Sequence, residues 1–305
     1  MQIAITGGTG FIGKHLTDAH ISRGDQVRVL TRKKNVCDNR IEYIEGDLRH
    51  SDLDRFVQNA DVLYHCAAEL KNEAMMHALH VEGMMRLLCA AKGKIGRWVQ
   101  LSSVGVYKKI KTGHVDEKTE IDPIGFYEKT KAEADSNLIF FAQKNNLDYV
   151  ILRPSNVFGV GMKSESLARL IKLIKKKLFV HVGKKESIVN YVFVDDVVNA
   201  LIACATQEKA LCQVYNLSQT TQTKKMIEAF AASCGVTAPR YYFPEGLLRA
   251  LTWFFSRIPG FPLTRGQVDA LTGGVFFDSE KIQEELGFVF QRELTKSLAD
   301  YSQKI

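Results

Sequence analysis

The first residues of the chain join an apolar run to a glycine-rich turn, and this junction constrains the fold more than any other segment. Residues 2–6 (QIAIT) have the length of a strand, and GGTGFIG follows at residues 7–13, before a helical pattern. Gly7 allows a tight turn, Gly10 lets the backbone approach a pyrophosphate, and Gly13 lets the helix pack on the strand. The free N–H groups of that helix would face the phosphates. The junction therefore predicts a dinucleotide site at the end of a first β-strand.

Strand and helix patterns alternate along the first half of the chain. Strand-length apolar runs occur at residues 27–30, 41–44, 62–65, 98–101 and 148–152, and helical patterns at residues 73–92 and 126–144. This alternation predicts an α/β fold with a doubly wound, Rossmann-type parallel sheet. We expect residues 191–194 and 213–217 to form further strands of that sheet.

The length of the chain favours a main domain with a smaller second lobe. At 305 residues the chain exceeds the usual size of a single domain. We expect a dinucleotide-binding Rossmann domain over residues 1–158, to which strands near residues 188–217 return. The substrate would then bind in a smaller, discontinuous C-terminal lobe built mainly from residues 159–187 and 218–305.

Three polar residues downstream of the glycine turn form a candidate catalytic group. Tyr127 and Lys131 are four residues apart on a predicted helix, so they share a helix face and the ammonium would favour the ionised phenol. Ser103 follows the strand at residues 98–101, at the edge where open α/β sheets bind ligands. A tyrosine and a lysine at this spacing are common by chance, so the prediction rests on the cofactor motif that precedes them. Together they predict proton transfer at an alcohol while a cofactor carries hydride.

Composition agrees with a globular enzyme of a reducing compartment. The hydrophobic fraction is 46% and the charged fraction 25%, and the six cysteines show no C-x-x-C pair. The N-terminus has no charged-then-apolar leader, which favours a cytoplasmic location over secretion. No metal site is predicted.

The motifs in combination resemble the extended short-chain dehydrogenase/reductase superfamily, the group of NAD-dependent epimerases and dehydratases. The motifs are TGGTGFIG at residues 6–13, GDL at 46–48, HCAA at 65–68, LSSVGVY at 101–107, YEKTK at 127–131, LRPSNVFG at 152–159, VFVDDVVNA at 192–200 and DSEKIQEELGF at 278–288. They span nearly the whole chain. Residues 247–258 and 263–268 resemble the 3β-hydroxysteroid dehydrogenase and dihydroflavonol reductase branches more than typical sugar epimerases.

This resemblance implies roles for individual residues. Ser103 and Tyr127 would be catalytic, and Lys131 would bind the nicotinamide ribose and lower the pKa of the tyrosine. Asp47 would accept from the adenine amine, and Leu48 would flank the ring. The cofactor would also contact Gly7, Gly10, Phe11, Ile12, Gly13, Arg32, Ala67, Ala68, Tyr127, Lys131, Pro154 and Val157.

The end of the second predicted strand indicates which cofactor binds. An acidic residue there would accept from the ribose hydroxyl of NAD, but the chain has Thr31, Arg32, Lys33 and Lys34. A positive cluster suits the 2′-phosphate, so we expect NADP in preference to NAD. Basic residues after such a strand are also ordinary solvated surface.

Departures from the family pattern narrow the reaction and the substrate. Dehydratases of the superfamily place an acidic pair after the catalytic serine or threonine, whereas this chain has Val104 and Gly105, so dehydration lacks its general acid. Asn156 matches a position that often contacts a sugar-nucleotide diphosphate. The arginine that usually accompanies it is replaced by Val189-Asn190-Tyr191. His80 stands where asparagine is common, and we interpret it as a helix histidine satisfied by the backbone or water.

Two segments outside the motifs carry charge or an apolar stripe. Lys172, Lys175, Lys176 and Lys177, with Lys184 and Lys185, make a basic stretch in a chain of net charge +7. It fits a solvated helix face, an anionic substrate or an anionic membrane. Residues 247–258 form an apolar stripe with Trp253 opposite, which suits a core helix or peripheral membrane contact.

Three functions stay open at this point. The first is a sugar-type oxidoreductase or epimerase, and the second is an NADP-dependent reductase or dehydrogenase of an apolar alcohol or ketone. The third is a non-catalytic subunit that binds a dinucleotide. We expect a small-molecule substrate and no nucleic acid, and the sequence leaves open a homodimer and membrane association.

Overall fold

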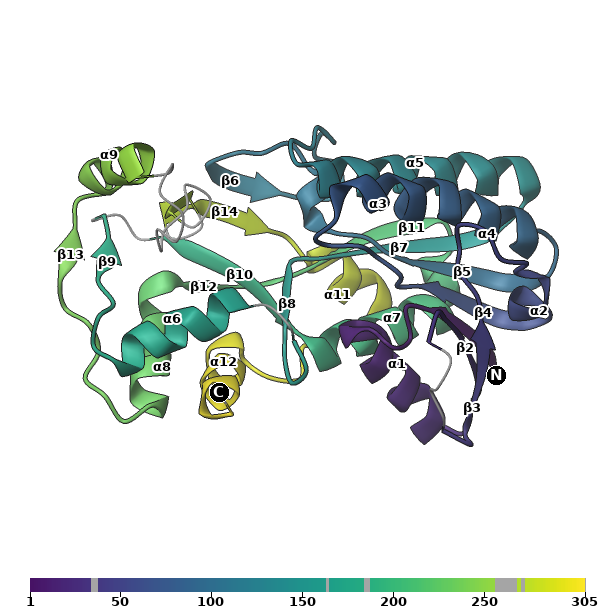
Figure 1. The fold of residues 1–305 in the computed structure, drawn as a ribbon, viewed down its shortest axis with the longest axis horizontal. Helices are drawn as coiled ribbons and strands as arrows, with labels where there is room; N and C mark the ends of the chain where they lie inside the picture. Colours follow the sequence, from purple (N-terminus) through teal and green to yellow (C-terminus); the bar gives the residue numbers. More distant parts are fainter. Residues whose placement is uncertain (34–37, 163–164, 184–186, 256–267, 270–271, 305) are drawn as a thin grey trace.

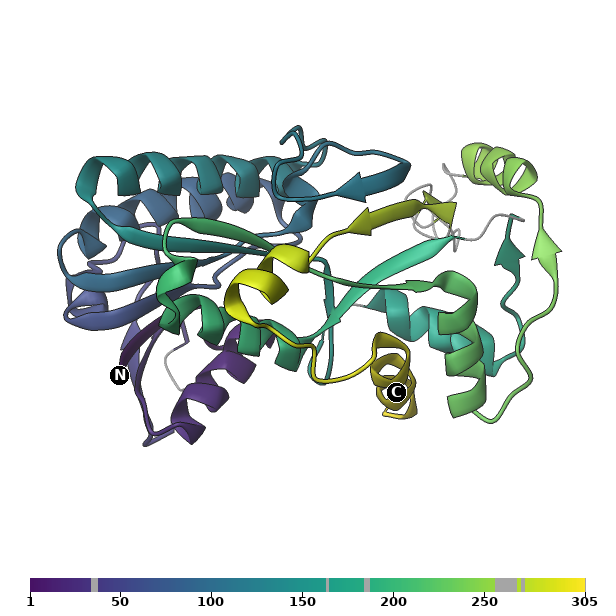
Figure 2. The same ribbon diagram turned by 180° about the vertical axis from the view of Figure 1, so that it is seen from behind.

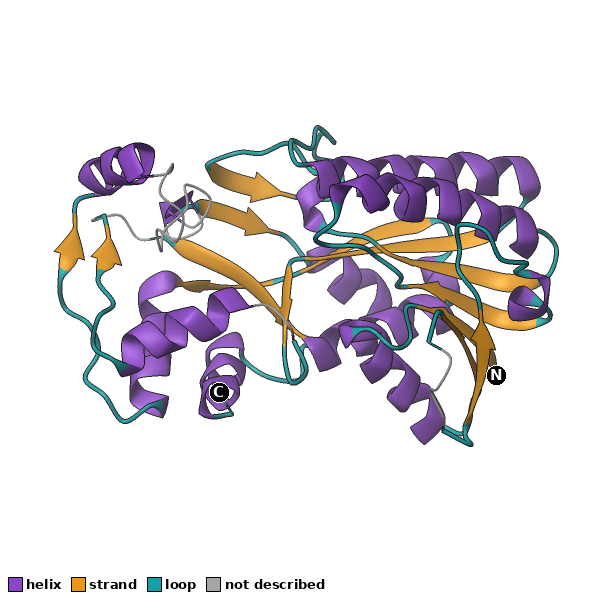
Figure 3. Cartoon of the chain, in the orientation of Figure 1, coloured by secondary structure: helices purple, strands orange, loops and turns teal. Residues whose placement is uncertain are grey.

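A seven-stranded parallel sheet forms the centre of the larger half of the molecule (Figures 1 and 3). The computed structural model describes residues 1–305 except 34–37, 163–164, 184–186, 256–267, 270–271 and 305. In order across the sheet, the strands are β11 (Gln213–Leu217), β7 (Asp148–Pro154), β5 (Ile95–Leu101), β4 (Ala60–His65), β1 (Gln2–Thr6), β2 (Gln26–Thr31) and β3 (Ile41–Glu45). The strand order reverses at β1, so the predicted doubly wound parallel sheet is confirmed.

Helices cover both faces of this sheet. One face carries α1 (Phe11–Ser22), α7 (Val194–Thr206) and α11 (Glu280–Leu286), and the other carries α2 (Asp54–Val57), α3 (Glu73–His77), a π-helix η1 (Ala78–Gly83), α4 (Met84–Ala91) and α5 (Phe126–Asn145). Ile3 and Ile5 belong to the core under α1 and α7, whereas Ala4 belongs to the core under α4 and α5. Because both faces are buried, the strands carry apolar residues on both sides, although polar residues occur in each of them.

The C-terminal elements form a second, smaller core at the other end of the molecule (Figures 1 and 2). Its elements are α6 (Glu165–Lys175), α8 (Thr223–Ser233), α9 (Glu245–Phe255), α12 (Leu294–Gln303), β8 (Asn156–Phe158), β9 (His181–Val182), β10 (Ile188–Phe193), β12 (Gln219–Gln222) and β13 (Tyr242–Phe243). Between the two ends, β6 (Thr112–Val115) pairs in parallel with β14 (Gly274–Phe277). Two short 3-10 turns, η2 (Val104–Val106) and η3 (Glu208–Ala210), complete the chain. The lobe boundaries expected at 158/159, 187/188 and 217/218 stay a prediction.

The expectation that residues 191–194 belong to the main sheet is wrong. These residues lie in β10, which pairs in parallel with β8 and antiparallel with β12 in a separate three-stranded sheet. Val192 faces the large core and Val189 faces the small one, so β10 is apolar on both sides without belonging to the large sheet. Residue 194 already begins α7. The expected strand at residues 213–217 does return to the sheet, as its edge strand β11.

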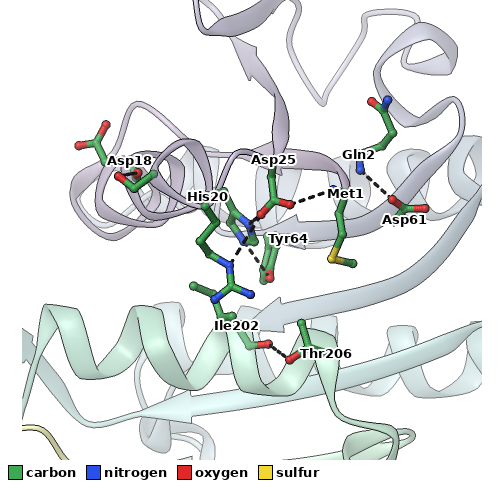
Figure 4. A network of polar contacts seen from close by, with 11 residues as sticks. Met1, Gln2, Asp18, His20, Asp25, Asp61, Tyr64, Ile202 and Thr206 are labelled. Carbon is green, nitrogen blue, oxygen red and sulfur yellow. Dashed lines mark hydrogen bonds and ion pairs between the residues drawn. The ribbon is translucent and has the colours of Figure 1, made fainter.

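A buried polar network fastens α1 to the sheet (Figure 4). His20 Nδ1 lies 2.7 Å from Asp25 Oδ2, and its Nε2 lies 3.0 Å from the Tyr64 hydroxyl. The Met1 nitrogen donates to Asp25 Oδ1 at 2.8 Å. Burial lowers the pKa of His20, although Asp25 acts in the opposite direction. The end of α1 is therefore held in place, which fixes where its N-terminus points.

Among the described residues, no helix has both the length and the apolar character needed to cross a bilayer. The apolar stripe expected at residues 247–258 falls partly on α9. Residues 256–258 and 263–267 lie outside the described part of the chain, as do Lys34, Lys184 and Lys185.

Candidate active site

The glycine turn brings the ends of β1 and β4 into backbone contact. Gly7 has a φ of +70°, and a Cβ there would lie 2.7 Å from the backbone nitrogen of Ala67. A Cβ at Gly13 would collide with the carbonyl of Gly7. The Gly10 N–H donates to the Gly7 carbonyl at 2.8 Å, and Gly10 caps α1 in an extended conformation. The turn is thus a cradle that side chains would fill, and it fits the pyrophosphate of a dinucleotide.

The remaining residues predicted near the pyrophosphate border this cradle. Thr6 Oγ1 is hydrogen-bonded to His65 Nδ1 at 2.8 Å and accepts from the Ala67 N–H at 3.3 Å, which ties the two strand ends together. Ala68 is exposed beyond them, and Phe11 and Ile12 are half-buried in the first turn of α1.

Three residues are predicted on the adenosine side of the site. One of them is exposed, and the side chains of the other two are occupied by contacts within the protein. Arg32 follows β2 and is exposed. The pKa of Glu69 is lowered chiefly by the hydrogen bond from the Lys71 backbone N–H, and the charge of Arg32 makes a smaller contribution. Asp47 accepts two hydrogen bonds from the Arg49 guanidinium, which hold the pKa of that carboxyl at about 2. The Leu48 side chain is only 3% exposed and belongs to the core under α4, so little of it is left to flank a ligand.

Helix α5 presents Tyr127 and Lys131 on the face that meets the end of β5. Lys131 is buried, and its Nζ donates to the Leu101 carbonyl at 2.6 Å. Ser103 lies two residues beyond that carbonyl, and its Oγ accepts from the Gly105 N–H at 3.1 Å. The structure therefore places Lys131 and Ser103 at the same strand end, as their spacing predicted.

The lowering of the Tyr127 pKa that we expected from Lys131 stays a prediction. Burial raises the pKa of Tyr127 to about 12, and the negative charges of Glu128 and Asp135 act in the same direction. Burial lowers the pKa of Lys131, and its ammonium is bound to Leu101 rather than to the phenol. The i, i+4 spacing placed both groups on one face correctly, but it did not reveal the competing carbonyl.

His80 joins the loop after β4 to α5. The backbone N–H of Glu69 donates to His80 Nε2 at 2.8 Å, so the ring proton is on Nδ1. Nδ1 then donates to Thr130 Oγ1 at 2.8 Å, and that hydroxyl donates to the Tyr127 carbonyl at 2.8 Å. Burial lowers the pKa of His80 to about 4, with a further contribution from Lys131. The interpretation of His80 as a helix histidine bonded to the backbone is confirmed, and its π-helical segment is a type often found at functional sites.

A buried ion pair supports the same helix one turn later. Asp135 Oδ2 accepts from the Ser102 hydroxyl at 2.7 Å and from Arg153 at 3.1 Å. Arg153 also donates to the Tyr107 hydroxyl at 3.0 Å, which in turn donates to Asn216 at 2.8 Å. The end of β5, α5 and β7 are thereby joined beneath the site, which holds Ser103 in position.

Comparison with known proteins agrees with this arrangement. Residues 3–218 match the NAD dependent epimerase/dehydratase family. The chain belongs to this family. It is 26% identical to UDP-glucose 4-epimerase of Vibrio cholerae, over 94% of this chain and 90% of that protein. It is 24% identical to sterol-4-alpha-carboxylate 3-dehydrogenase, decarboxylating, of Mus musculus, over 84% of this chain and 75% of that protein.

A solved structure shares the fold. The crystal structure of UDP-glucuronic acid 4-epimerase from Bacillus cereus in complex with NAD superposes with a TM-score of 0.79 at 20% identity. The match covers 100% of this chain and 99% of that one. These matches place the chain in the extended short-chain dehydrogenase/reductase superfamily.

An acidic side chain that the sequence analysis missed lies beside Ser103 in this member of the epimerase/dehydratase family. A Cβ on Gly105 would lie 2.7 Å from Glu128 Cγ and 3.3 Å from Ser103 Oγ. Glu128 also lies against Gly125, where a Cβ would meet its carboxylate. The loop after Ser103 carries no acidic pair, and the Glu128 side chain from α5 passes over Gly105 with its carboxylate against Gly125. The sequence feature that could have indicated this position is a glutamate in the first turn of a helix, with two glycines opposite its side chain.

Glu128 lines a cavity of about 420 Å³ together with Val104 and Gly105, which follow Ser103 in the chain. Apolar walls come from Val104, Ile110, Ile124, Val275 and Phe277, with Lys108 and Lys109 also present. Lys108 is paired with Glu120 at 2.8 Å and Lys109 with Asp269 at 3.6 Å. The cavity therefore offers apolar surface and one carboxylate to a substrate.

The predicted substrate residue Asn156 has a structural partner. Its Nδ2 donates to the Asn190 carbonyl at 3.0 Å, across the β8–β10 pair. Asn190, at the position of the missing arginine, donates from Nδ2 to the Val275 carbonyl and accepts from Thr220 Oγ1 at 2.7 Å. Pro154 ends β7 and is buried, and Val157 is half-buried in β8.

We expect Glu128→Gln to lower the pKa of the Tyr127 phenol below its value of about 12, because a negative charge beside the tyrosinate is removed. Titration of ¹³Cζ-labelled tyrosine by NMR would report this shift. Glu133→Gln on the same helix is the control, since Glu133 is exposed and lies 3.6 Å from His77. An unchanged Tyr127 pKa in Glu128→Gln, or an equal shift in both variants, would contradict the conclusion that the charge of Glu128 raises the pKa of Tyr127.

Proposed function

We propose that the chain is an NAD(P)-dependent oxidoreductase that acts at a secondary alcohol or ketone, with Tyr127 as its acid/base. One series of contacts carries this proposal. It runs from the Gly7 turn to the loop at residues 67–69, then to His80, and from His80 through Thr130 to the backbone of Tyr127. A cofactor cradle and a candidate acid/base are thus parts of one hydrogen-bonded unit.

The side chains would divide the chemistry among them. The nicotinamide cofactor, when bound, gives or takes the hydride. In reduction, the Tyr127 phenol would donate its proton to the substrate carbonyl oxygen as hydride arrives; in oxidation, the Tyr127 tyrosinate would take the proton of the substrate hydroxyl. Because Ser103 Oγ already accepts from Gly105, its own proton is available for the substrate oxygen. Lys131 uses one of its three donors on Leu101, which leaves two for the cofactor ribose.

Two substrate classes compete. A sugar nucleotide is supported by the family and by the Vibrio cholerae relative. An apolar alcohol or ketone is supported by the apolar walls of the cavity and by the engagement of Asn190 at the position of the missing arginine. The sterol dehydrogenase relative is in line with the second class.

The amount of cofactor consumed per product formed distinguishes a reductase of an apolar ketone from a sugar epimerase. A reductase of an apolar ketone consumes added NADPH in proportion to product, whereas an epimerase uses its cofactor catalytically. A screen of UDP-sugars, steroids and small ketones, followed by absorbance of the reduced nicotinamide and by product chromatography, would test both. Dinucleotide binding without turnover on any of them, and without any effect of Tyr127→Phe, would support a non-catalytic subunit instead.

NADP is the proposed cofactor, because Arg32 is exposed at the end of β2, where the adenosine ribose is expected. A charge-assisted contact contributes about 1.5 to 3 kcal/mol. Arg32→Ala should therefore weaken NADP binding by roughly ten- to a hundredfold and spare NAD. Calorimetry with both cofactors measures this, with Lys92→Ala, which removes an exposed positive charge elsewhere, as a control. Tighter binding of NAD than NADP by the unmodified protein would refute the preference.

The homodimer that the sequence leaves open stays a prediction.

A further inference from the structure

The end of the molecule farthest from the main sheet exposes a group of large apolar side chains. This end is formed by α6, the segment that follows it, the β9–β13 pair and the start of α9 (Figure 1). The exposed apolar side chains are Leu173, Leu178, Val180, Tyr241, Tyr242 and Leu247. Tyr241 is 80% exposed and Leu178 is 66% exposed. We call these six residues, together with the exposed lysines of α6 and its C-terminus, the distal face.

Backbone hydrogen bonds hold the segments of the distal face together. The Leu178 N–H donates to the Leu173 carbonyl at 2.9 Å, and the His181 N–H donates to the Tyr241 carbonyl at 2.9 Å. Tyr242 pairs with His181 in the β9–β13 sheet and stacks on its ring at 4.9 Å. The segments that carry these side chains are therefore joined to one another by backbone hydrogen bonds and ring stacking.

The same segments carry a dense positive charge. Lys172, Lys175, Lys176 and Lys177 are all exposed. Residues 166–183 contain five lysines and arginines and no acidic residue, and Glu165 immediately precedes them. Among the described residues, no acidic side chain forms an ion pair with these four lysines. The apolar side of α6 is occupied by the second core, through Leu167, Ile171 and Ile174, so its lysines must face outward.

We propose that the distal face binds an anionic membrane surface peripherally. Lysines of this kind are attracted to anionic headgroups, and exposed leucine, valine and tyrosine side chains can enter the boundary between headgroups and acyl chains. Nucleic acid would satisfy the lysines but would give no contact to the aliphatic side chains. The cradle and Tyr127 lie on other elements, so this surface does not depend on the proposed reaction.

Sedimentation with lipid vesicles tests the proposal. The full chain is mixed with vesicles of phosphatidylcholine alone, or of phosphatidylcholine and phosphatidylglycerol at about three to one. We expect binding to the anionic vesicles only, weakened by salt. The triple variant Lys172→Gln, Lys175→Gln, Lys176→Gln should lose affinity by about fivefold per lysine, on the order of a hundredfold in all.

Two further variants separate the contributions. The control triple Lys92→Gln, Lys118→Gln, Lys209→Gln removes the same charge from exposed lysines elsewhere and should bind as the unmodified protein does. Leu178→Ser with Tyr241→Ser should bind several-fold more weakly without any change of charge. Unchanged binding of NADP would show that each variant is folded.

Several results would overturn the proposal. Equal losses in both lysine triples would show that only net charge matters, and equal pelleting with neutral vesicles would remove the role of the lysines. Sedimentation that fails with anionic vesicles, while single-stranded RNA is shifted in a gel, would assign the distal face to nucleic acid.

Discussion

Replacing Tyr127 by phenylalanine should lower turnover by about 10²- to 10⁴-fold, the range expected for the loss of a general acid/base. The substitution removes only the hydroxyl. The ring of Tyr127 lies in edge contact with His80 at 5.6 Å, and its carbonyl accepts from Thr130; both features survive in phenylalanine. Cofactor affinity and thermal stability should therefore stay within the error of calorimetry and scanning measurements.

Two companion variants define what this result means. Tyr241→Phe removes a phenol at the far end of the molecule and should leave turnover unchanged. Lys131→Met keeps the length of a buried side chain but removes its charge, so turnover and cofactor affinity should both fall. Near-normal turnover in Tyr127→Phe would mean that another group moves the proton, and would bring the non-catalytic alternative forward.

The elements around the cofactor cradle were predictable because local signals and burial agree there. The helix expected at residues 126–144 is α5, Phe126–Asn145, and the strand expected at residues 27–30 is β2, Gln26–Thr31. Strands covered on both faces carry apolar residues on both sides, and a glycine turn follows β1. β10 gave the same apolar signal for a different reason, since it lies between two cores, and no local pattern distinguishes these cases.

The contacts that complete the site could not be predicted, because they join residues far apart in the chain. His80 meets Thr130 fifty positions away, and Asp135 meets Arg153 across a helix and a strand. Glu128 could not be identified for a related reason. The family pattern places an acidic pair directly after Ser103, whereas Glu128 lies on α5 and approaches Gly105 only in the folded chain. The i, i+4 spacing within α5 predicted that Tyr127 and Lys131 share a helix face. It did not predict that the Lys131 ammonium would donate to the Leu101 carbonyl.

Replacing Gly10 by glutamate should nearly abolish dinucleotide binding. Gly10 caps α1 and is exposed, and a Cβ there would already lie 3.0 Å from the Gly7 carbonyl. The added carboxylate would stand at the helix N-terminus, where the pyrophosphate is expected. Two like charges about 4 Å apart near a protein surface repel by about 4 kcal/mol. We therefore expect affinity for NADP and for NAD to fall by about a thousandfold.

The matched control places the same charge at the other end of the same helix. Ser22 is exposed in the last turn of α1, and its hydroxyl bonds only to the Asp18 carbonyl at 2.9 Å. Ser22→Glu should leave calorimetric affinity for both cofactors within a few-fold of the unmodified protein. Circular dichroism of Gly10→Glu must show an unchanged fold for the comparison to hold. If folded Gly10→Glu binds either cofactor normally, the dinucleotide does not lie on the Gly7–Gly13 turn. The proposed roles of Arg32 and Lys131 in holding it would then fail as well, because both assume a cofactor that extends from this turn toward β2 on one side and α5 on the other.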